Sequence, residues 1–145
     1  MRVYLLHHAD AVGPDINPQR PLSSAGVEHA ERLATLAQAR GTGPAAIWHS
    51  GKLRARQTAE PFWRLCSPFA EFKMVRGLGP DDPPDIIHTA ILGESRDLLI
   101  AGHMPNIAAI RRRLVGDAAE FPHHGFVAVE TEDQGVTWRE LWRLP

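Results

Sequence analysis

The sequence predicts an α/β fold: a single three-layer domain over residues 1–145, with a mostly parallel central sheet, helices on both faces and a C-terminal β-hairpin. Short apolar runs alternate with segments of helical periodicity through most of the chain, which is the pattern of α/β proteins. The first run, Val3–Leu6, is uninterrupted, as expected of a strand covered on both faces. Near the end, Phe126–Thr131 and Val136–Trp142 flank the turn 132–135 and predict the hairpin.

After the first strand, the pattern predicts a loop, a helix and a second strand. Gly13–Pro21 holds three prolines and predicts the loop. Ser23 or Ser24 then caps a helix that ends at Gly41, and its apolar residues recur at helical spacing, at Val27, Ala30, Leu33, Leu36 and Ala37. Ala45–Trp48 predicts the second strand.

The next helix begins near Ser50, and Pro61 predicts a kink or break in it because proline cannot donate a backbone hydrogen bond. The rest of the chain predicts a short strand, a turn with a short helix, a strand and a helix, at Glu71–Val75, Asp81–Leu92, Asp97–Ala101 and Asn106–Leu114. In the second hairpin arm, strand alternation places Val136, Trp138 and Trp142 on one face, which predicts packing rather than a ligand platform.

Composition argues against several classes of function. Hydrophobic residues at 43% and charged residues at 23% are ordinary for a globular protein. The formal net charge of −1 argues against nucleic-acid binding, and the one compact basic run, Arg111–Arg113, predicts the exposed side of a helix. No apolar run approaches the ~20 residues that span a bilayer. The single Cys66 cannot form an intramolecular disulfide, so we expect a cytoplasmic protein.

Two histidine-containing segments and one arginine lie just beyond predicted strands. His7 and His8 end the first strand, and His103 follows the run Leu98–Ala101. Arg54 lies in the first turn of the helix that follows the second strand. The carboxyl ends of strands form the usual ligand-binding edge of an open α/β sheet, so these side chains are candidates for one site. Imidazoles and a cation at that edge indicate phosphoryl chemistry with a histidine nucleophile.

Four segments carry a family resemblance: Met1–Asp10, Arg20-Pro21-Leu22-Ser23-x-x-Gly26, Ser50–Thr58 and Ala101–Asn106. They resemble the histidine phosphatase superfamily and, more narrowly, its SixA-like branch of phosphohistidine phosphatases. The resemblance implies a phosphoglycerate mutase-like fold, no cofactor, and a nucleophilic His8 that becomes phosphohistidine before water hydrolyses it. One position departs from the family pattern, because the family has arginine directly before the nucleophile and this chain has His7.

The remaining roles follow from the resemblance and from the chemistry of the side chains. Arg54 and His103 are expected to hold the phosphoryl group, Arg54 with its guanidinium and the free N–H groups of the first helical turn. His7 leaves three outcomes open. It donates to the phosphate as a neutral or protonated imidazole, another cation such as Arg20 substitutes, or the chain is a phosphate- or phosphohistidine-binding module that is catalytically weak or inactive.

A leaving group needs a proton, and Asp81 or Asp82 is the candidate general acid. The same residues also fit a turn rich in Asp and Pro, or a helix cap. We expect no metal site, since His123 and His124 match no zinc spacing and adjacent residues on a strand point to opposite faces.

The expected partner is phosphohistidine on a protein or a small phosphorylated molecule. A phosphoramidate leaves easily once its nitrogen is protonated, so weak acid assistance suits phosphohistidine better than an alkyl phosphate. Neither nucleic acid nor a membrane is expected as a partner, and we expect a monomer or weak dimer.

Overall fold

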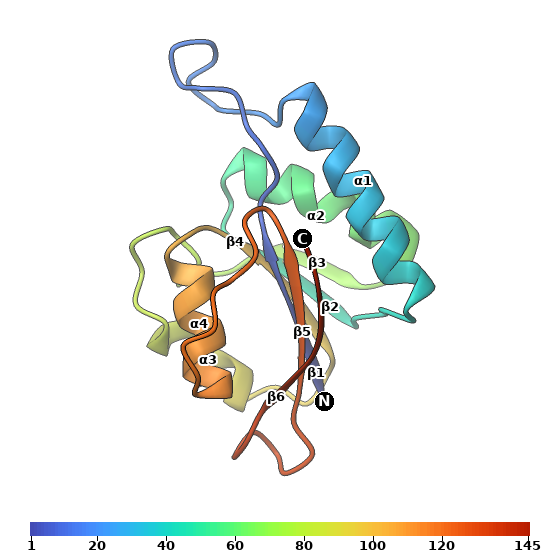
Figure 1. Cartoon of the computed structure of the whole chain (residues 1–145), viewed down its shortest axis with the longest axis vertical. Coiled ribbons are helices and arrows are strands. Elements are labelled where there is room, and N and C mark those ends of the chain that lie inside the picture. The colour runs from blue at the N-terminus through green and yellow to red at the C-terminus, as the bar shows by residue number, and fades with distance from the viewer.

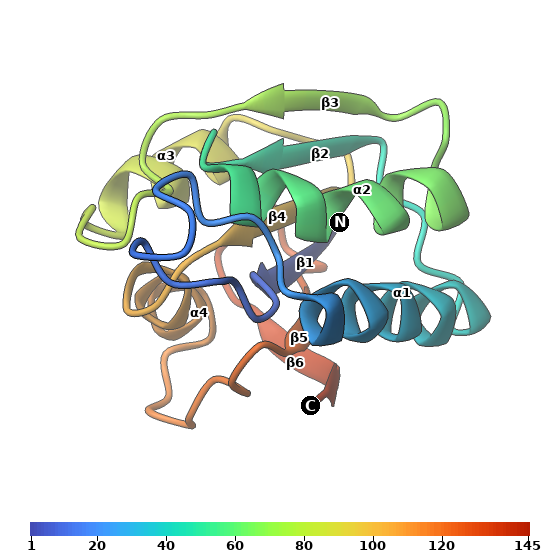
Figure 2. The same cartoon turned by 90° about the horizontal axis from the view of Figure 1, so that it is seen from above.

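The structure, a computed structural model, describes residues 1–145 and consists of one central sheet with helices on both faces (Figures 1 and 2). The strands are β1 (Arg2–His7), β2 (Ala46–His49), β3 (Glu71–Met74), β4 (Leu98–Gly102), β5 (Phe126–Glu130) and β6 (Arg139–Leu144). The helices are α1 (Ser24–Ala39), α2 (Leu53–Cys66), α3 (Asp85–Leu92) and α4 (Asn106–Val115). None of these helices combines the length and the hydropathy that a bilayer crossing requires.

Across the sheet the strand order is β3-β2-β4-β1-β5-β6. β3, β2, β4 and β1 are parallel to one another, whereas β5 pairs antiparallel with β1 and β6 pairs antiparallel with β5. One helix lies between each successive pair of the parallel strands β1 to β4, as parallel connections usually require, and α4 lies between β4 and the antiparallel β5. The predicted α/β class, with a mostly parallel sheet and a C-terminal hairpin, is confirmed.

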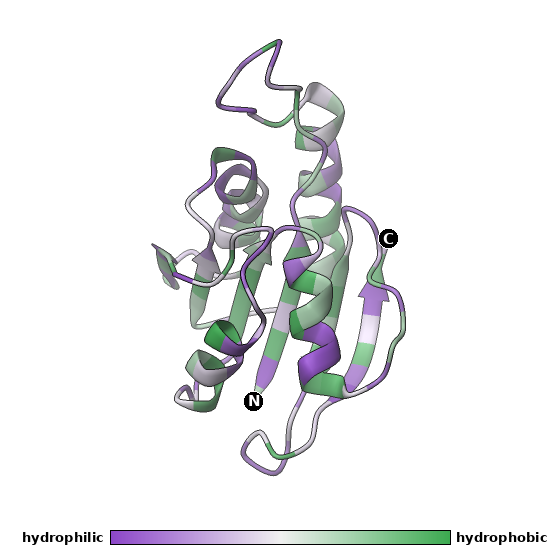
Figure 3. Cartoon of the chain, turned by 90° about the vertical axis from the view of Figure 1, so that its left-hand side faces the viewer, coloured by the Kyte–Doolittle hydropathy of each residue, from purple (hydrophilic) through white to green (hydrophobic).

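The two faces of β1 belong to two separate apolar layers. Val3 and Leu5 pack with residues of α3 and α4, and Tyr4 and Leu6 pack with residues of α1 and α2. All four side chains are buried, because a strand between two helical layers has no solvent face. Figure 3 shows hydrophobic residues along the central strands and hydrophilic stretches on the helices.

α1 begins where the sequence predicts, with Ser23 as its N-cap. The Ser23 hydroxyl oxygen accepts a hydrogen bond from the Gly26 N–H at 3.0 Å. Gly26 also allows a close approach, because an added Cβ would lie 2.1 Å from the carbonyl oxygen of Asp10. The Ser23 N–H donates to that same carbonyl at 3.0 Å. The Ser-x-x-Gly spacing therefore attaches α1 to the loop that follows β1.

The structure corrects part of two local predictions about helices. α2 has no break at Pro61, which is buried together with Ala59 and Phe62, so packing of this face offsets the lost backbone hydrogen bond. The basic run of α4 is also not wholly exposed. Arg111 is only 2% exposed and donates to Glu140 at 2.9 and 2.6 Å, so it joins α4 to β6.

The second hairpin arm is shorter than predicted, because β6 begins at Arg139 and leaves Val136 exposed. The two tryptophans also do not share a face. Trp138 belongs to the layer of α3 and α4, whereas Trp142 packs against the layer of α1 and α2. An irregularity in the pairing opposite Ala128 shifts the register by one residue, and such a bulge reverses the alternation of side chains beyond it.

Candidate functional site

An open cavity of about 430 Å³ lies at the carboxyl edge of the parallel strands. The cavity contains every residue that the sequence predicts for a phosphate site, together with other side chains that the sequence did not predict there. The lining consists of His7, His8, Asp10, Ala11, Arg20, Arg54, Pro80, His103, Met104, His123 and His124.

The pairing of β1 with β4 brings the first two histidine segments together. His7 pairs with Gly102 in the sheet, and the His8 N–H donates to the Gly102 carbonyl at 3.0 Å. The rings of His8 and His103 consequently lie 5.0 Å apart, centre to centre. Two strand ends that are far apart in sequence thus supply neighbouring imidazoles.

Thr58 links α2 to the loop that follows β1, and the sequence pattern gave this residue no separate role. The buried Thr58 hydroxyl accepts a hydrogen bond from the Ala9 N–H at 2.9 Å and donates to the Arg54 carbonyl at 2.7 Å. One side chain therefore links the residue after His8 to the residue that supplies the guanidinium. The spacing of Arg54 and Thr58, one helical turn apart, is a sequence signal that could have revealed this link.

His123 and His124 reach the cavity from the turn before β5. Because β5 runs antiparallel to β1, its first residue lies beside the end of β1, with Phe126 opposite Leu6. The expectation that the two histidines lie on a strand is wrong: both are in a turn, and His124 has a positive φ of 52°. Their rings are 3.8 Å apart, so they do not point to opposite faces.

The surroundings of His8 determine which of its ring nitrogens carries the proton. Nδ1 lies 2.7 Å from the carbonyl oxygen of Ala9, which can only accept, so Nδ1 is the donor. Burial and the charge of Arg54 lower the pKa of His8 to about 4, although the bond to Ala9 opposes this shift. Near neutral pH the ring is therefore neutral, and Nε2 has a free lone pair.

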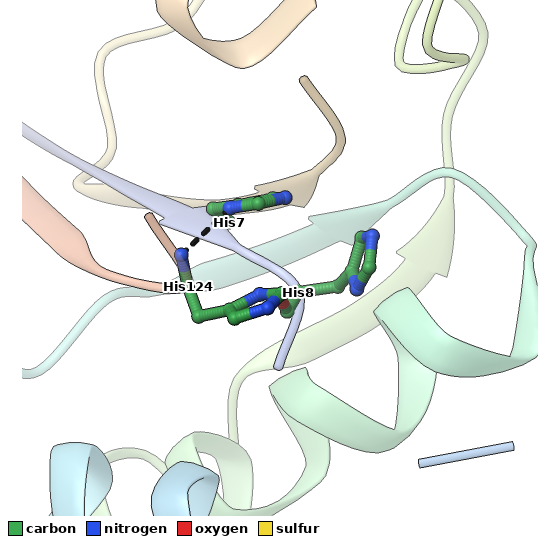
Figure 4. A group of neighbouring side chains, drawn as sticks. All are labelled: His7, His8 and His124. Atoms are coloured by element: carbon green, nitrogen blue, oxygen red, sulfur yellow. Dashed lines mark hydrogen bonds between the residues drawn. The ribbon is translucent and has the colours of Figure 1, made fainter. Parts of the chain in front are cut away.

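His7 has the opposite tautomer. Its Nδ1 accepts a hydrogen bond from the backbone N–H of His124 at 2.7 Å, shown as the dashed line in Figure 4. Burial, with smaller effects from the neighbouring histidines, lowers the pKa of His7 to about 3. The neutral ring then carries its proton on Nε2. His7 is thus an uncharged hydrogen-bond donor at the position where the family has arginine.

Two further donors have no partner within the protein. The Nδ1 of His103 and the Nε of Arg54 are buried and form no hydrogen bond. The other nitrogen of His103, Nε2, lies 2.7 Å from the Ser50 hydroxyl, which can donate to it and leave the proton on Nδ1. Buried donors are nearly always paired, so these two N–H groups are candidates to donate to the oxygens of a ligand.

Arg20 lies in the cavity, as the sequence analysis suggested. Its Nε donates to the carbonyl of Val12 at 2.9 Å, across the loop that leaves β1. Its positive charge helps to lower the pKa of His8, after burial and Arg54. For Arg54, burial is the main cause of a lowered pKa, and Arg20 adds to it. Arg20 and Arg54 are the two cationic side chains in the cavity lining.

The two aspartates proposed as general acids do not line the cavity. Asp82 accepts a hydrogen bond from the Gly79 N–H at 2.8 Å, which is the turn-capping alternative. Its carbonyl also accepts from the side chain of Asn106, a buried residue that the sequence analysis did not single out. Asp81 is exposed, and the neighbouring Pro80 reaches the cavity instead.

His7, His8 and His124 place one ring nitrogen each within 4.8 Å of one another, which is close enough to consider a metal ion (Figure 4). A metal-binding imidazole offers a lone pair and donates its other N–H to an acceptor. His8 and His124 satisfy this rule, since their Nδ1 atoms lie 2.7 and 2.6 Å from the carbonyls of Ala9 and His8. His7 does not, because its Nδ1 already accepts a hydrogen bond. The trio therefore suits an oxyanion better than a cation.

No protein-family model and no curated protein matches the sequence. Solved structures match over nearly the whole chain. A phosphohistidine phosphatase SixA from Agrobacterium tumefaciens, described as putative, has a TM-score of 0.83 at 25% identity and covers 99% of this chain and 97% of its own. The protein histidine phosphatase SixA complexed with tungstate has a TM-score of 0.84 at 19% identity, covering 99% and 96%.

A more distant neighbour is a mycobacterial glucosyl-3-phosphoglycerate phosphatase, with a TM-score of 0.71 at 14% identity and 96% coverage of both chains. The neighbours therefore include phosphatases of differing substrate. The resemblance that the sequence motifs indicate is confirmed: the chain has the phosphoglycerate mutase-like fold of the histidine phosphatase superfamily, with SixA phosphohistidine phosphatases among its structural neighbours.

Proposed function

We propose that the protein is a phosphatase that acts in two steps through a phosphohistidine at His8. In the first step, Nε2 of His8 bonds to phosphorus while the bond to the leaving group breaks. In the second, water attacks the phosphohistidine, inorganic phosphate departs, and the electron pair returns to Nε2. Arg54, Arg20 and the N–H groups of His7 and His103 hold the oxygens that carry the developing charge.

The observation that carries this proposal is the division of roles among the ring nitrogens. His8 faces the cavity with a lone pair, since Nδ1 is bound to the Ala9 carbonyl. His103 has an unpaired, buried Nδ1 in the same cavity, and Arg54 has an unpaired, buried Nε. A nucleophile beside donors for negative oxygens is what phosphoryl transfer requires.

The substrate that we favour is phosphohistidine on a protein, with a small phosphorylated molecule as the other candidate. The cavity has an exposed rim that includes Asp10 and His123, so it admits a side chain from a protein surface. A phosphoramidate bond also needs little help from an acid. The tungstate complex of a structural neighbour supports the binding of a tetrahedral oxyanion in this fold.

A single-turnover reaction with ³²P-labelled phosphoramidate tests the proposal. We expect a label on the protein that is stable in base and labile in acid, as phosphohistidine is. The label should be absent from His8→Ala and retained by His88→Ala, a change in α3 outside the cavity. Labelling of His8→Ala, or no labelling of the wild-type protein, contradicts the mechanism.

One observation favours a second candidate, a phosphohistidine-binding module with little or no turnover. The pKa of His7 is lowered to about 3, so this residue cannot replace the permanent charge of an arginine near neutral pH. Calorimetry with vanadate and with a phosphohistidine peptide, run beside the turnover assay, separates the candidates. Binding that depends on His8 without any release of phosphate supports the module, and measurable release excludes it.

A further inference from the structure

Transfer of a phosphoryl group from an ester requires a proton for the departing oxygen, and the residues expected to supply it are not in the cavity. Asp81 and Asp82 lie outside the lining. Asp10 lines the cavity, but one of its carboxylate oxygens accepts a hydrogen bond from the Ser23 hydroxyl at 2.7 Å. Asp10 therefore already has a structural partner in the N-cap residue of α1.

Contacts or burial set aside four of the five histidines in the lining as proton donors. His8 and His124 use their Nδ1–H groups on backbone carbonyls. His7 and His103 are buried, and burial lowers the pKa of both, so neither carries a second proton near neutral pH. The fifth, His123, is exposed and forms no hydrogen bond through its ring, so both of its ring nitrogens are free to contact a substrate.

The position of His123 also suits a proton donor. Its ring lies 5.2 Å from that of His7, and the ring of His8 lies 4.7 Å from His7. His7 and His124 thus both neighbour His8 and His123, and the rings of His124 and His123 lie 3.8 Å apart. When the N–H of His7 holds a phosphoryl oxygen, in-line transfer sets the attacking and leaving atoms on opposite sides of phosphorus. His123 lines the same cavity at its solvent-exposed rim, so its ring can reach a leaving group that departs toward solvent.

We propose that His123 is the general acid and base of this site, an inference that rests on the proposed phosphatase function. As the bond from phosphorus to the leaving oxygen breaks, imidazolium His123 gives its proton to that oxygen and becomes neutral. In the second step neutral His123 takes a proton from the attacking water. The oxygen of that water bonds to phosphorus, the bond to His8 breaks, and His123 is again an imidazolium.

Leaving-group dependence tests this role, because an acid matters only when the departing group is a strong base. In His123→Gln we expect kcat/KM for phenyl phosphate to fall about 30- to 100-fold, and for p-nitrophenyl phosphate less than about threefold. This ratio reports the steps up to the phosphoenzyme, so slow hydrolysis of the intermediate does not obscure the result. Phosphoramidate, whose nitrogen is already protonated, should react at nearly the wild-type rate.

Two controls accompany the series. His88→Gln removes a histidine from α3 outside the cavity and should change neither ester. Added imidazole should raise the rate of phenyl phosphate hydrolysis by His123→Ala at least about threefold, because free imidazole can take the place of an exposed acid. It should have no effect on the wild-type protein. His123 is exposed, so neither of its variants should perturb folding.

The outcomes separate this inference from the proposed function. Equal losses for both esters, no loss for either, or no rescue by imidazole overturns the role of His123. If the wild-type protein still forms an acid-labile phosphoenzyme in those cases, the phosphatase mechanism stands without a catalytic role for His123. If the wild-type protein forms no phosphoenzyme with any substrate, both proposals fall together.

Discussion

At the scale of single residues, the presence of His7 where the family has arginine determines the charge of the site. The buried neutral imidazole keeps a hydrogen-bond donor in place but lacks the permanent charge and the forked geometry of a guanidinium. Arg54 and Arg20 therefore supply the fixed positive charge in the cavity lining. We expect modest oxyanion affinity and slow turnover as a result.

The variant His7→Arg tests that reasoning directly. A bidentate, charged contact should tighten vanadate binding and raise kcat/KM for phosphoramidate, each about tenfold, which corresponds to about 1.4 kcal/mol. Calorimetry and steady-state kinetics measure the two effects, and His88→Arg serves as the matched control. Unchanged values in His7→Arg would mean that residue 7 does not face the bound phosphate.

The same buried histidines predict a loss of stability in acid. His7 and His103 have an ordinary pKa of 6.5 that falls to about 3 in the folded protein, mainly because burial disfavours their charged forms. Above pH 6.5 both rings are neutral in the folded and the unfolded chain, so neither lowers the free energy of unfolding. As the pH falls toward 3, the unfolded chain binds more protons, so the free energy of unfolding drops, by at most about 1.4 kcal/mol per pH unit for each histidine.

Urea unfolding at pH 7, 6 and 5 measures this dependence. His7→Gln removes one titrating group, while the glutamine oxygen can still accept from the His124 N–H. We therefore expect a shallower decline of stability with falling pH in His7→Gln than in the wild-type protein. Identical slopes for the two proteins would show that His7 does not titrate as its burial implies.

At the scale of elements, Thr58 sets the position of α2 relative to the loop that follows β1. Removal of its hydroxyl in Thr58→Val leaves the Ala9 N–H without its acceptor. We expect the free energy of unfolding to fall by about 1–3 kcal/mol. We also expect a lower kcat/KM, because the hydrogen bonds that link Ala9, next to His8, with Arg54 are lost.

Thr58→Ser is the matched control, since it retains the hydroxyl and should recover most of both losses. Denaturant unfolding and phosphoramidate kinetics provide the two measurements. If Thr58→Val reduces stability without lowering kcat/KM, the link supports the fold but does not position the nucleophile.

At the scale of the whole molecule, the buried Arg111 joins helix and hairpin. It donates to Glu140 on β6 and to Asp117 just beyond α4. Arg111→Ala would leave the partly buried Glu140 carboxylate with only Arg143 as a partner. Because Glu140 keeps Arg143 as a partner, we expect a loss of about 1–3 kcal/mol in the free energy of unfolding from the lost hydrogen bonds.

Arg112→Ala, on the exposed side of the same helix, should change stability by less than about 0.5 kcal/mol. Thermal and denaturant unfolding of both variants decide the matter. A loss in Arg111→Ala no greater than that in Arg112→Ala would mean that the buried arginine contributes nothing to holding β6 on α4.

Sequence patterns predicted the elements well where short-range spacing decides the structure. The uninterrupted apolar run in β1 and the Ser-x-x-Gly cap of α1 both lie where expected. The same patterns failed at β6, because a one-residue register shift turns the side chains beyond it toward the opposite helical layer. They also allowed a break at Pro61 that does not occur, because the packing of α2 outweighs the local preference of proline. Such effects depend on partners elsewhere in the chain, which local periodicity does not contain.

The sequence by itself determined the order of strands and helices, and it put His8, Arg54 and His103 at the ends of elements, because periodicity and strand endings are local properties. Only the tertiary structure decided how these residues act. The antiparallel return of β5 brings His124 to His7, 117 positions away, and that contact sets the tautomer of His7. Burial between distant elements then keeps the rings neutral, since the cost of desolvating a charge exists only after the chain has folded around it.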